Sequence, residues 1–287
     1  MNGFDLHTHT TASDGTNSPE TNVRLAKEAG LAGIAVTDHD TVAGVAEAVA
    51  CGKRIGIEVV PGVEISTAAD GKDIHVLGYW IDTTDERFLR RLAGQRNTRD
   101  RRNEMILQKL AELGYAVTEE EVLAQAAARP GKDGSVGRPH IASAMVAKGY
   151  VGSITEAFDR FLAEGSAAYV NPERIPPEEA VRWILEAGGV PVLAHPGLYG
   201  DDKLVERLIG CGLKGIEVRH ADHAPEDEAR YGKMAEAFGL IATAGSDFHG
   251  ERGGQIFHAP LGSRRADFET VERLRIVSET IRKETYR

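Results

Sequence analysis

Short apolar runs alternate with amphipathic helical patterns along most of the chain, and glycines and prolines mark the boundaries between them. This alternation is typical of βα units, in which helices cover a sheet of mainly parallel strands. The chain has 287 residues, of which 41% are hydrophobic, so it can bury the core of a barrel-sized domain. The sequence therefore predicts an α/β protein built around a barrel.

Seven apolar runs are the expected strands of this barrel. They cover residues 3–6, 33–36, 57–60, 73–78, 190–194, 215–218 and 240–243. The clearest helical patterns between them lie at 19–30, 42–54, 177–187 and 225–238, and a last helix begins near residue 267. The first helix has the best-defined ends, because Ser18 before Pro19 is a typical helix start and Gly30 a typical helix end.

Between residues 85 and 166 the strand pattern disappears and only helical patterns remain. The expected helices lie at 87–113, 119–128, 139–148 and 154–162, with a loop at 129–134. The composition of this part is that of a globular unit, without low-complexity sequence or repeats. We therefore expect residues 85–166 to form an inserted helical subdomain, and residues 1–84 and 167–287 to form the two parts of the barrel.

Histidines and acids stand where the expected strands end. His7 and His9 follow the first strand, and because extended side chains alternate in direction, both imidazoles point to the same side. The residues at or just past the end of an apolar run are His7, His9, His39, Glu64, His195, Asp247 and His249. His75 lies inside a run. In a parallel barrel the carboxyl ends of the strands share one face, so these side chains should converge at one mouth.

This set offers more ligands than one metal ion needs. The imidazole nitrogens are joined by the carboxylates of Asp14, Glu64 and Asp247. A mixed set of nitrogen and oxygen donors favours two or three divalent ions such as Mn²⁺, Zn²⁺ or Fe²⁺. The alternative, a buried histidine with ordinary hydrogen bonds, explains His75 most easily but does not explain the whole set. Asp38 and Asp40 are expected to support or cap neighbouring groups rather than bind metal.

Composition and motifs exclude several classes of protein. The net charge of −10 argues against binding of long nucleic acid or of an anionic membrane, although one pocket could still hold a small anion. Cys51 and Cys211 are far apart and indicate free thiols, and no leader or membrane-spanning pattern is present, so a cytoplasmic protein is expected. No P-loop, Gly-x-Ser-x-Gly or His-Glu-x-x-His motif occurs, which removes P-loop NTPases, elbow-type serine hydrolases and zincins.

Seven segments together resemble the PHP (polymerase and histidinol phosphatase) family in order and spacing. They are Asp5-Leu6-His7-Thr8-His9, Asp14-Gly15, Thr37-Asp38-His39-Asp40, Pro61-Gly62-Val63-Glu64, His75, Ala194-His195-Pro196 and Gly245-Ser246-Asp247-Phe248-His249. The resemblance implies a distorted (β/α)7 barrel that hydrolyses phosphoesters with two or three metal ions, Mn²⁺ being favoured and Zn²⁺ or Fe²⁺ the alternatives. It also implies three ligand sets: His7, His9, Glu64 and Asp247; Glu64, His75 and His195; Asp14, His39 and His249.

Two stretches of the insertion, 96–103 and 136–142, resemble family members that act on nucleotides, the 3′,5′-nucleoside bisphosphate phosphatases. The resemblance implies removal of the 3′-phosphate to leave a nucleoside 5′-monophosphate, and some members also trim short RNA from its 5′ end. Arginine suits the second phosphate, because a guanidinium can bind it through two parallel hydrogen bonds. Arg96, Arg99 and Arg102 lie three residues apart, on roughly one face of a helix.

The residues expected to bind the substrate are Arg99, Arg102, Arg138, His140 and Arg219, within an insertion that covers the mouth and at the end of a barrel strand. The alternative for the helical arginines is a solvated face on which Asp100 and Glu104 pair with them, and His140 could instead cap a helix. The residues expected to act in catalysis are Asp247, His195 and His220, where a metal or a protonated histidine would assist the leaving 3′ oxygen.

Three alternatives remain open from the sequence: a histidinol phosphate phosphatase, a 5′-to-3′ exoribonuclease on short RNA, and a non-catalytic scaffold stabilised by metal. The complete ligand pattern favours an active enzyme over the scaffold. The expected partner is a small nucleotide or a short RNA, with no long nucleic acid and no membrane, and the sequence indicates no particular oligomeric state.

Overall fold

The computed structural model of the protein describes residues 3–125, 135–170, 172–252, 254–256 and 258–285. Seven strands form one sheet, in which each strand is hydrogen-bonded to the next along the chain. They are β1 Phe4–Asp5, β2 Gly33–Val36, β3 Glu58–Ala69, β4 Lys72–Tyr79, β5 Val190–Leu193, β6 Gly215–His220 and β7 Ile241–Gly245. The seven expected strands are confirmed, although β3 is much longer than expected.

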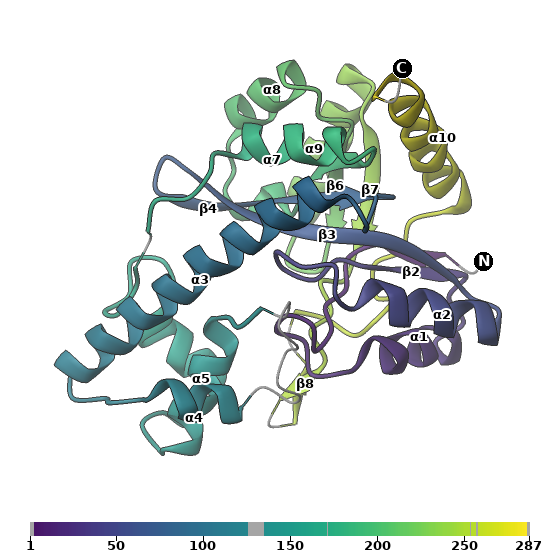
Figure 1. Ribbon diagram of the computed structural model, residues 1–287. Helices are drawn as coiled ribbons and strands as arrows, with labels where there is room; N and C mark the ends of the chain where they lie inside the picture. Colours follow the sequence, from purple (N-terminus) through teal and green to yellow (C-terminus); the bar gives the residue numbers. More distant parts are fainter. Residues whose placement is uncertain (1–2, 126–134, 171, 253, 257, 286–287) are drawn as a thin grey trace.

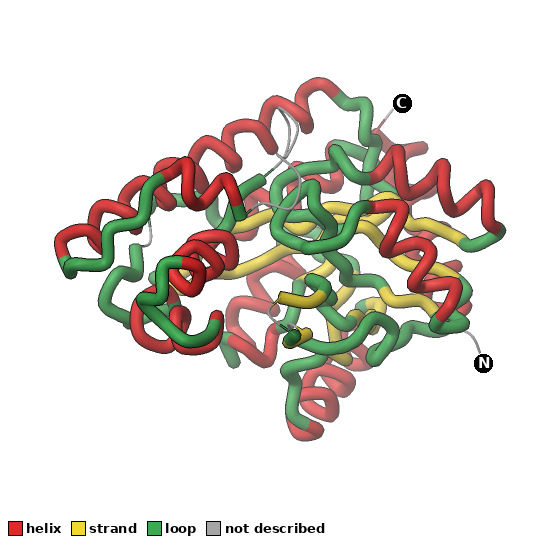
Figure 2. The backbone as a smooth tube through the Cα atoms, turned by 90° about the horizontal axis from the view of Figure 1, so that it is seen from below, coloured by secondary structure: helices red, strands yellow, loops and turns green. Residues whose placement is uncertain are grey.

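Helices cover the outside of this sheet (Figures 1 and 2). They are α1 Pro19–Glu28, α2 Val45–Ile55, α7 Pro177–Glu186, α8 Asp202–Gly210, α9 Pro225–Phe238 and α10 Phe268–Thr285. Ser18 caps α1 as expected, since its hydroxyl accepts a hydrogen bond from the backbone N–H of Thr21 at 3.1 Å. Gly30, just past the helix, has a φ of 69°, a conformation that glycine adopts without strain.

The sheet curls into a nearly closed barrel, as expected. The backbone N–H of Leu6, directly after β1, donates to the carbonyl oxygen of Ala244 in β7 at 3.1 Å, so the first and last strands meet. Apolar side chains such as Leu77 and Val192 are fully buried in the core. The closure brings residues near both ends of the chain to one site.

The fourth strand departs from the expected parallel arrangement. β4 runs antiparallel to β3 and β5, whereas the other neighbouring strands of the barrel are parallel. The cause is the pair Asp70 and Gly71, which joins β3 to β4 with φ angles of 51° and 83°. Two consecutive residues with positive φ form a tight hairpin turn, whereas a parallel neighbour would need a crossover of about a dozen residues.

The hairpin explains where two of the site residues lie. Because β3 continues into the turn, Glu64 lies within the strand rather than at its end, and Ser66 pairs with His75 across the hairpin. The backbone N–H of Ala194, just past β5, donates to the carbonyl of His75. The reversed direction of β4 therefore brings His75, from the first half of that strand, to the end of the barrel where the parallel strands finish.

The helices of the predicted insertion are α3 Glu86–Glu112, α4 Glu119–Ala124, α5 Arg138–Ala147 and α6 Ile154–Ala157, followed by the π-helical turn η1 Phe158–Leu162. Figure 1 shows α3 extending from the barrel to α4 and α5. Its Phe88 packs in the barrel core and its Ile106 in a separate core of the insertion, so one helix joins both. The predicted loop 129–134 lies outside the described residues, and the division at residues 84 and 166 stays a prediction.

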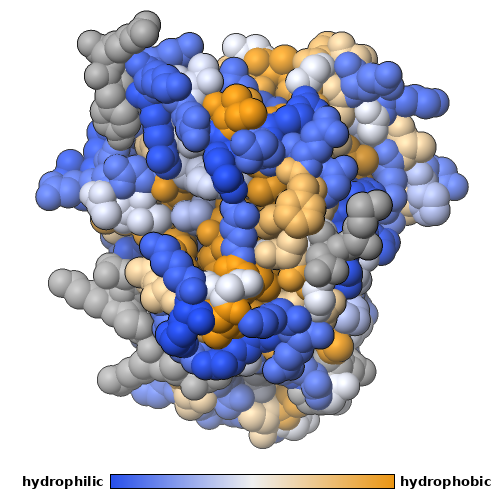
Figure 3. All heavy atoms as spheres, turned by 90° about the vertical axis from the view of Figure 1, so that its right-hand side faces the viewer, coloured by the Kyte–Doolittle hydropathy of each residue, from blue (hydrophilic) through white to orange (hydrophobic). Residues whose placement is uncertain are grey.

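A short hairpin after the last barrel strand was not expected from the sequence. It consists of β8 Glu251–Arg252 and β9 Gln255–Ile256. On the side of the molecule that carries α10, hydrophilic residues separate the apolar patches of the surface (Figure 3). No helix within the described ranges has both the length and the apolar character needed to cross a membrane.

Candidate metal centre and anion site

The polar residues predicted at the strand ends meet at one end of the barrel. The strands and the segments that follow them contribute His7, His9, Asp14, His39, Glu64, His75, His195, His220, Asp247 and His249. All are buried except His75, whose side chain is 17% exposed. Asp247 and His195 have φ angles of 54° and 27°, unusual for residues with a side chain and common where a functional site fixes the backbone.

Four side chains of this ligand cluster surround one point. Nε2 of His7 lies 3.3 Å from Oδ1 of Asp247 and 3.4 Å from Oε1 of Glu64. Nε2 of His9 lies 3.1 Å from the same Asp247 oxygen and 3.3 Å from Oε2 of Glu64. Ligands about 2.0–2.2 Å from one ion in a tetrahedral site are roughly 3.4 Å apart, so these separations fit a metal. The same four residues form the first ligand set implied by the family resemblance.

Glu64 also faces the second ligand set. Its Oε1 lies 2.9 Å from Nδ1 of His75 and 3.2 Å from Nε2 of His195. Its Oε2 lies 2.9 Å from Nδ1 of His39. One carboxylate thus stands between imidazoles that reach it from several strands, which is the position of a bridging ligand.

Asp14 is the centre of the third set. Its Oδ1 lies 3.3 Å from Nε2 of His249, and its Oδ2 lies 3.9 Å from Nε2 of His39. His9 belongs to the same group, because its ligand atom lies within 4.8 Å of the others. The geometry therefore brings together the three ligand sets expected from the sequence.

Many polar atoms of the cluster have no hydrogen-bond partner among the described residues, although they are buried. They are Nε2 of His7, both ring nitrogens of His9, Oδ1 of Asp14, Nδ1 of His39, Oε2 of Glu64, Nδ1 of His75, Nδ1 of His195, Nε2 of His220 and Oδ1 of Asp247. Buried polar groups nearly always have a partner, so a concentration like this indicates a missing one. Divalent cations bind this combination of donors, and the residues present therefore fit a metal centre.

The charges of the cluster support this conclusion. Burial lowers the pKa of His9, but the nearby carboxylates of Asp247 and Glu64 outweigh burial and raise the pKa to about 10. Burial would raise the pKa of Glu64, yet the imidazoles packed around it, those of His39 and His75 first, hold that pKa well below its usual range. Burial lowers the pKa of His39 to about 3, which keeps this ring neutral as a metal ligand must be. Protons on imidazoles thus compensate the carboxylates when no cation does.

We expect Mn²⁺ or Zn²⁺ to raise the melting temperature of the chelator-treated protein by several degrees. An ion that binds only the folded state stabilises it by about 4 kcal/mol at a thousand times its Kd. The gain should increase from pH 6 to pH 8, because the ion must displace protons held by rings such as His9. Thermal unfolding at three pH values measures both effects. An unchanged melting temperature at saturating metal would argue against a metal centre.

Sequence reasoning missed Glu217, which lies inside β6 and orients two ligands. Its Oε1 lies 3.1 Å from Nδ1 of His7, so the other ring nitrogen faces the cluster. Its Oε2 accepts a hydrogen bond from the backbone N–H of His195 at 2.9 Å. The signal that could have revealed it is a single acid within the otherwise apolar run 215–218.

Other carboxylates hold the loops that carry the ligands. Asp38 accepts hydrogen bonds from the backbone N–H of Thr10 at 2.7 Å and from the hydroxyl of Ser13 at 2.6 Å, and so fixes the segment between His9 and Asp14. Asp5 accepts from the backbone N–H of Ser246 at 2.9 Å, next to Asp247. Asp38 therefore has the supporting position that was expected of it.

Two histidines face Oδ2 of Asp247. Nε2 of His220, a predicted catalytic residue, lies 3.4 Å from Oδ2 of Asp247. Nε2 of His258 lies 3.4 Å from the same oxygen, and its Nδ1 lies 2.6 Å from Asp222. His258 was not predicted, because it follows the unexpected hairpin β8–β9 rather than a barrel strand.

Two of the predicted substrate-binding arginines already have partners. Nε and Nη2 of Arg99 donate to Oδ2 of Asp40 at 3.2 and 3.1 Å. Nη2 of Arg138 donates to Oδ2 of Asp73 at 2.9 Å. Both arginines line the cavity beside the ligand cluster. The expected supporting role of Asp40 is thus to hold the guanidinium of Arg99.

Arg102 lines the same cavity, but its contacts differ from those of Arg99 and Arg138. Its side chain is 3% exposed, and its Nε and Nη2 have no hydrogen-bond partner among the described residues. Burial, and then the charges of Arg138 and Arg99, hold the pKa of Arg102 well below its usual range. Asp73 forms ion pairs with both Arg138 and Arg174. Arg174 was not among the predicted site residues. A buried guanidinium among other cations is unfavourable unless an anion binds it.

The two remaining predicted substrate residues do not line this cavity. Arg219 is exposed and donates from Nη2 to the carbonyl of Arg265. The strand pairing shifts between Glu217 and Arg219, and this bulge leaves His220 rather than Arg219 facing the ligand cluster. His140 is buried, and its Nδ1 accepts a hydrogen bond from the backbone N–H of Gly137 at 3.1 Å. It therefore caps α5, which was the alternative considered for it.

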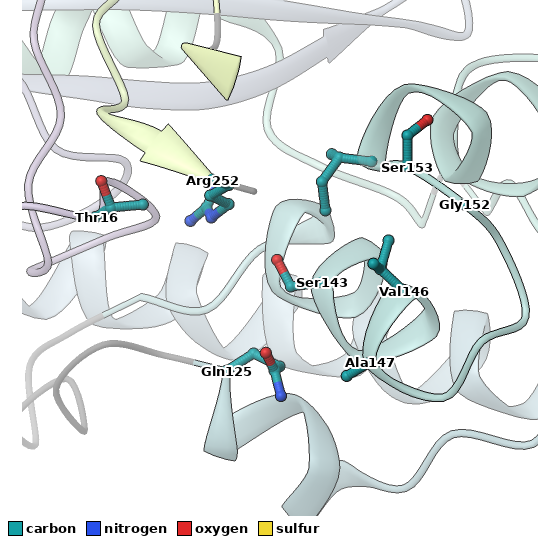
Figure 4. A pocket seen from close by; sticks show the side chains of 9 residues that line it. Thr16, Gln125, Ser143, Val146, Ala147, Gly152, Ser153 and Arg252 are labelled. Atoms are coloured by element: carbon teal, nitrogen blue, oxygen red, sulfur yellow. The ribbon is translucent and has the colours of Figure 1, made fainter. Parts of the chain in front are cut away.

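The ligand cluster and the arginines line a cavity of about 210 Å³, here called the metal-site cavity. Its wall also includes Pro139, Phe158 and Leu198. A second cavity, of about 400 Å³, lies farther along α5 and is shown in Figure 4, where Ser143 of α5 and Gln125 face the space and Arg252 lies across it. Arg252 donates to the backbone carbonyl of Asp14, so it links this space to the ligand cluster.

Similar proteins cover most of this chain. The family model of the PHP domain matches residues 5–169. A 5′-3′ exoribonuclease of Haemophilus influenzae is 36% identical over 86% of this chain and 89% of its own. A phosphoribosyl 1,2-cyclic phosphate 1,2-diphosphodiesterase of Eggerthella lenta is 35% identical over 87% and 95%, and a 3′,5′-nucleoside bisphosphate phosphatase of Chromobacterium violaceum is 34% identical over 90% and 92%.

A solved structure from Bifidobacterium adolescentis, described as a metal-dependent phosphoesterase, aligns with a TM-score of 0.89 at 33% identity, covering 96% of each chain. The three relatives have names for three different phosphoester reactions at nearly equal identity. What they have in common is therefore the class of reaction, whereas the substrate differs among them.

Proposed function

The chain belongs to the PHP domain family and is a phosphoesterase, and from this premise we propose that it removes the 3′-phosphate from nucleoside 3′,5′-bisphosphates. The products would be a nucleoside 5′-monophosphate and phosphate. The observation that carries the proposal is the guanidinium of Arg102, which has no partner for Nε and Nη2 among the described residues and lines the same cavity as the ligand cluster.

A substrate with two phosphates matches these two sites. One phosphate would lie at the metal centre, where divalent ions held by the ligand cluster would supply positive charge. The other would bind Arg102, whose Nε and Nη2 can donate two hydrogen bonds to one phosphate. Arg99 and Arg138 would add positive charge without leaving their present partners. A monophosphate such as histidinol phosphate would leave Arg102 without an anion, which is why we favour the bisphosphate.

In this proposal the barrel supplies the reaction site and residues 85–166 supply the anion site as a substrate-binding subdomain. Bound divalent ions, Mn²⁺ first among those considered, would activate water and neutralise charge on the phosphoryl group. Nδ1 of His220 accepts a hydrogen bond from the backbone N–H of Asp222 at 3.1 Å, which leaves Nε2 as the nitrogen that carries a proton. That nitrogen points towards Asp247 and could donate to the leaving 3′ oxygen.

The test is phosphate release from adenosine 3′,5′-bisphosphate with added Mn²⁺, with product identification by chromatography. We expect metal-dependent release that yields adenosine 5′-monophosphate and stops on chelation. Histidinol phosphate, assayed in parallel, should react about 10- to 100-fold more slowly, because it lacks the second anion that Arg102 would bind. Faster hydrolysis of histidinol phosphate would reject the bisphosphate proposal and keep the phosphoesterase assignment.

A second candidate is a 5′-to-3′ exoribonuclease on short RNA, since the Haemophilus influenzae relative carries that name. The second cavity beyond Arg252 would give a longer substrate room past the ligand cluster. A 5′-phosphorylated RNA of five nucleotides distinguishes the two candidates. Stepwise release of nucleoside 5′-monophosphates at a rate above that for the bisphosphate would favour the exoribonuclease.

A further inference from the structure

The wall of the metal-site cavity contains three apolar side chains next to its otherwise charged lining. They are Pro139 and Phe158 of the insertion and Leu198, which follows β5. Leu198 is 53% exposed, although it borders a cavity lined by histidines, acids and arginines. An exposed leucine alone is common on proteins, so its meaning depends on how it is held and on what faces it.

The backbone around Leu198 is held firmly. Nε2 of His223 accepts a hydrogen bond from the N–H of Gly197 at 3.0 Å, and the hydroxyl of Tyr231 donates to the carbonyl of Pro196 at 3.1 Å. Both His223 and Tyr231 are buried. The segment therefore keeps Leu198 at the cavity even though about half of the residue is exposed.

Phe158 belongs to an unusual piece of backbone. It is the first residue of the π-helical turn η1, and its carbonyl accepts hydrogen bonds from the N–H of Ala163 at 2.8 Å and from the hydroxyl of Ser166 at 3.3 Å. Short π-helical turns are rare and occur frequently at functional sites. Part of the ring packs on the core of the insertion, while the residue also lines the cavity.

We propose that Phe158 and Leu198 form an apolar clamp for the base of the nucleotide, with the base stacked on the ring of Phe158 and contacted by Leu198. This inference rests on the proposed function and names how the same site recognises its substrate. A nucleobase is the flat, apolar part of a nucleotide, and stacking on an aromatic ring suits every base. Neither side chain can donate or accept a hydrogen bond, so the clamp should accept purines and pyrimidines alike.

The clamp predicts which substrates each variant affects. Stacking of one base on an aromatic ring corresponds to about a 10- to 100-fold change in affinity. Phe158→Ala should therefore raise KM for adenosine 3′,5′-bisphosphate by about that factor, with little change in kcat. Phe158→Tyr should retain the wild-type KM. Phe158→Leu preserves apolar volume for folding but has no aromatic ring, so it should lose most of the affinity and raise KM. Leu198→Ala should have a smaller effect, and Leu113→Ala, at an exposed leucine directly after the end of α3, should have none.

The experiment measures kcat and KM of these variants on adenosine 3′,5′-bisphosphate, its uridine counterpart and an abasic deoxyribose 3,5-bisphosphate, after thermal unfolding shows that each variant folds. A loss confined to the two base-bearing substrates supports the clamp. Equal losses on the abasic analogue, or no loss with Phe158→Leu, would overturn it.

A binding measurement separates failure of the clamp from failure of the proposed function. The metal-loaded wild type and Phe158→Leu are titrated with adenosine 5′-monophosphate and with ribose 5-phosphate by calorimetry. If no bisphosphate is hydrolysed but the monophosphate binds at least about 10-fold tighter to the wild type, and ribose 5-phosphate does not, the clamp stands and the proposed reaction falls. If bisphosphates are hydrolysed but both proteins bind the two ligands alike, the reaction stands and the clamp falls.

Discussion

Replacing Glu64 by glutamine is expected to lower kcat for phosphate release by about 10³-fold or more. Groups behind metal ligands typically change activity by about 10- to 100-fold, and Glu64 stands in the midst of the ligands themselves. Its carboxylate lies within 3.4 Å of ring nitrogens of His7, His9, His39, His75 and His195. An amide keeps the shape of the side chain but removes the negative charge and one acceptor, so at least one ion should be lost.

The measurement combines steady-state rates with the metal content of the purified variant. Glu58→Gln is the matched control, because Glu58 begins the same strand, pairs with Arg275 and lies away from the cluster. We expect the control to retain both activity and metal. Full metal content with unchanged activity in Glu64→Gln would show that this carboxylate is not a bridging ligand.

Much of the barrel could be predicted because each strand is a short apolar run with glycine or proline beside it. The fourth strand was predicted with the wrong direction, although its position was right. The information was present in Asp70 and Gly71, whose positive φ angles close a two-residue hairpin. A strong βα rhythm on both sides concealed that turn. The same turn explains why His75, inside a strand, reaches the ligands as closely as residues at strand ends do.

The metal ligands could be predicted because strand ends converge in a barrel wherever their side chains stand in the sequence. The substrate side of the cavity could not be predicted as well. Whether an arginine is paired depends on contacts between distant segments: Arg99 donates hydrogen bonds to Asp40, whereas Arg102 forms no ion pair among the described residues. Arg219 was misplaced because a bulge in β6 changes which side chains point inward, and one-residue irregularities leave no mark on apolar patterns.

Replacing Arg102 by methionine is expected to make the protein more stable and a poorer enzyme at the same time. Methionine keeps the length of the buried side chain and removes a charge that faces Arg138 and Arg99 and forms no ion pair among the described residues. Replacing buried charges by apolar groups can stabilise a protein by about 1–4 kcal/mol, which corresponds to several degrees in melting temperature. Loss of a hydrogen bond between charged groups should raise KM for the bisphosphate by about 10- to 100-fold.

Three measurements separate this explanation from a general effect of removing arginine. Arg101→Met is the matched control, since Arg101 is the exposed neighbour on the same helix and should change neither stability nor KM. Inorganic phosphate should raise the melting temperature of the wild type more than that of Arg102→Met, because the buried guanidinium gains its missing anion only in the former. Hydrolysis of p-nitrophenyl phosphate, which carries one phosphate, should change by no more than about twofold in Arg102→Met. A variant that is less stable than the wild type, with equal losses on both substrates, would mean that Arg102 holds the fold together and binds no second phosphate.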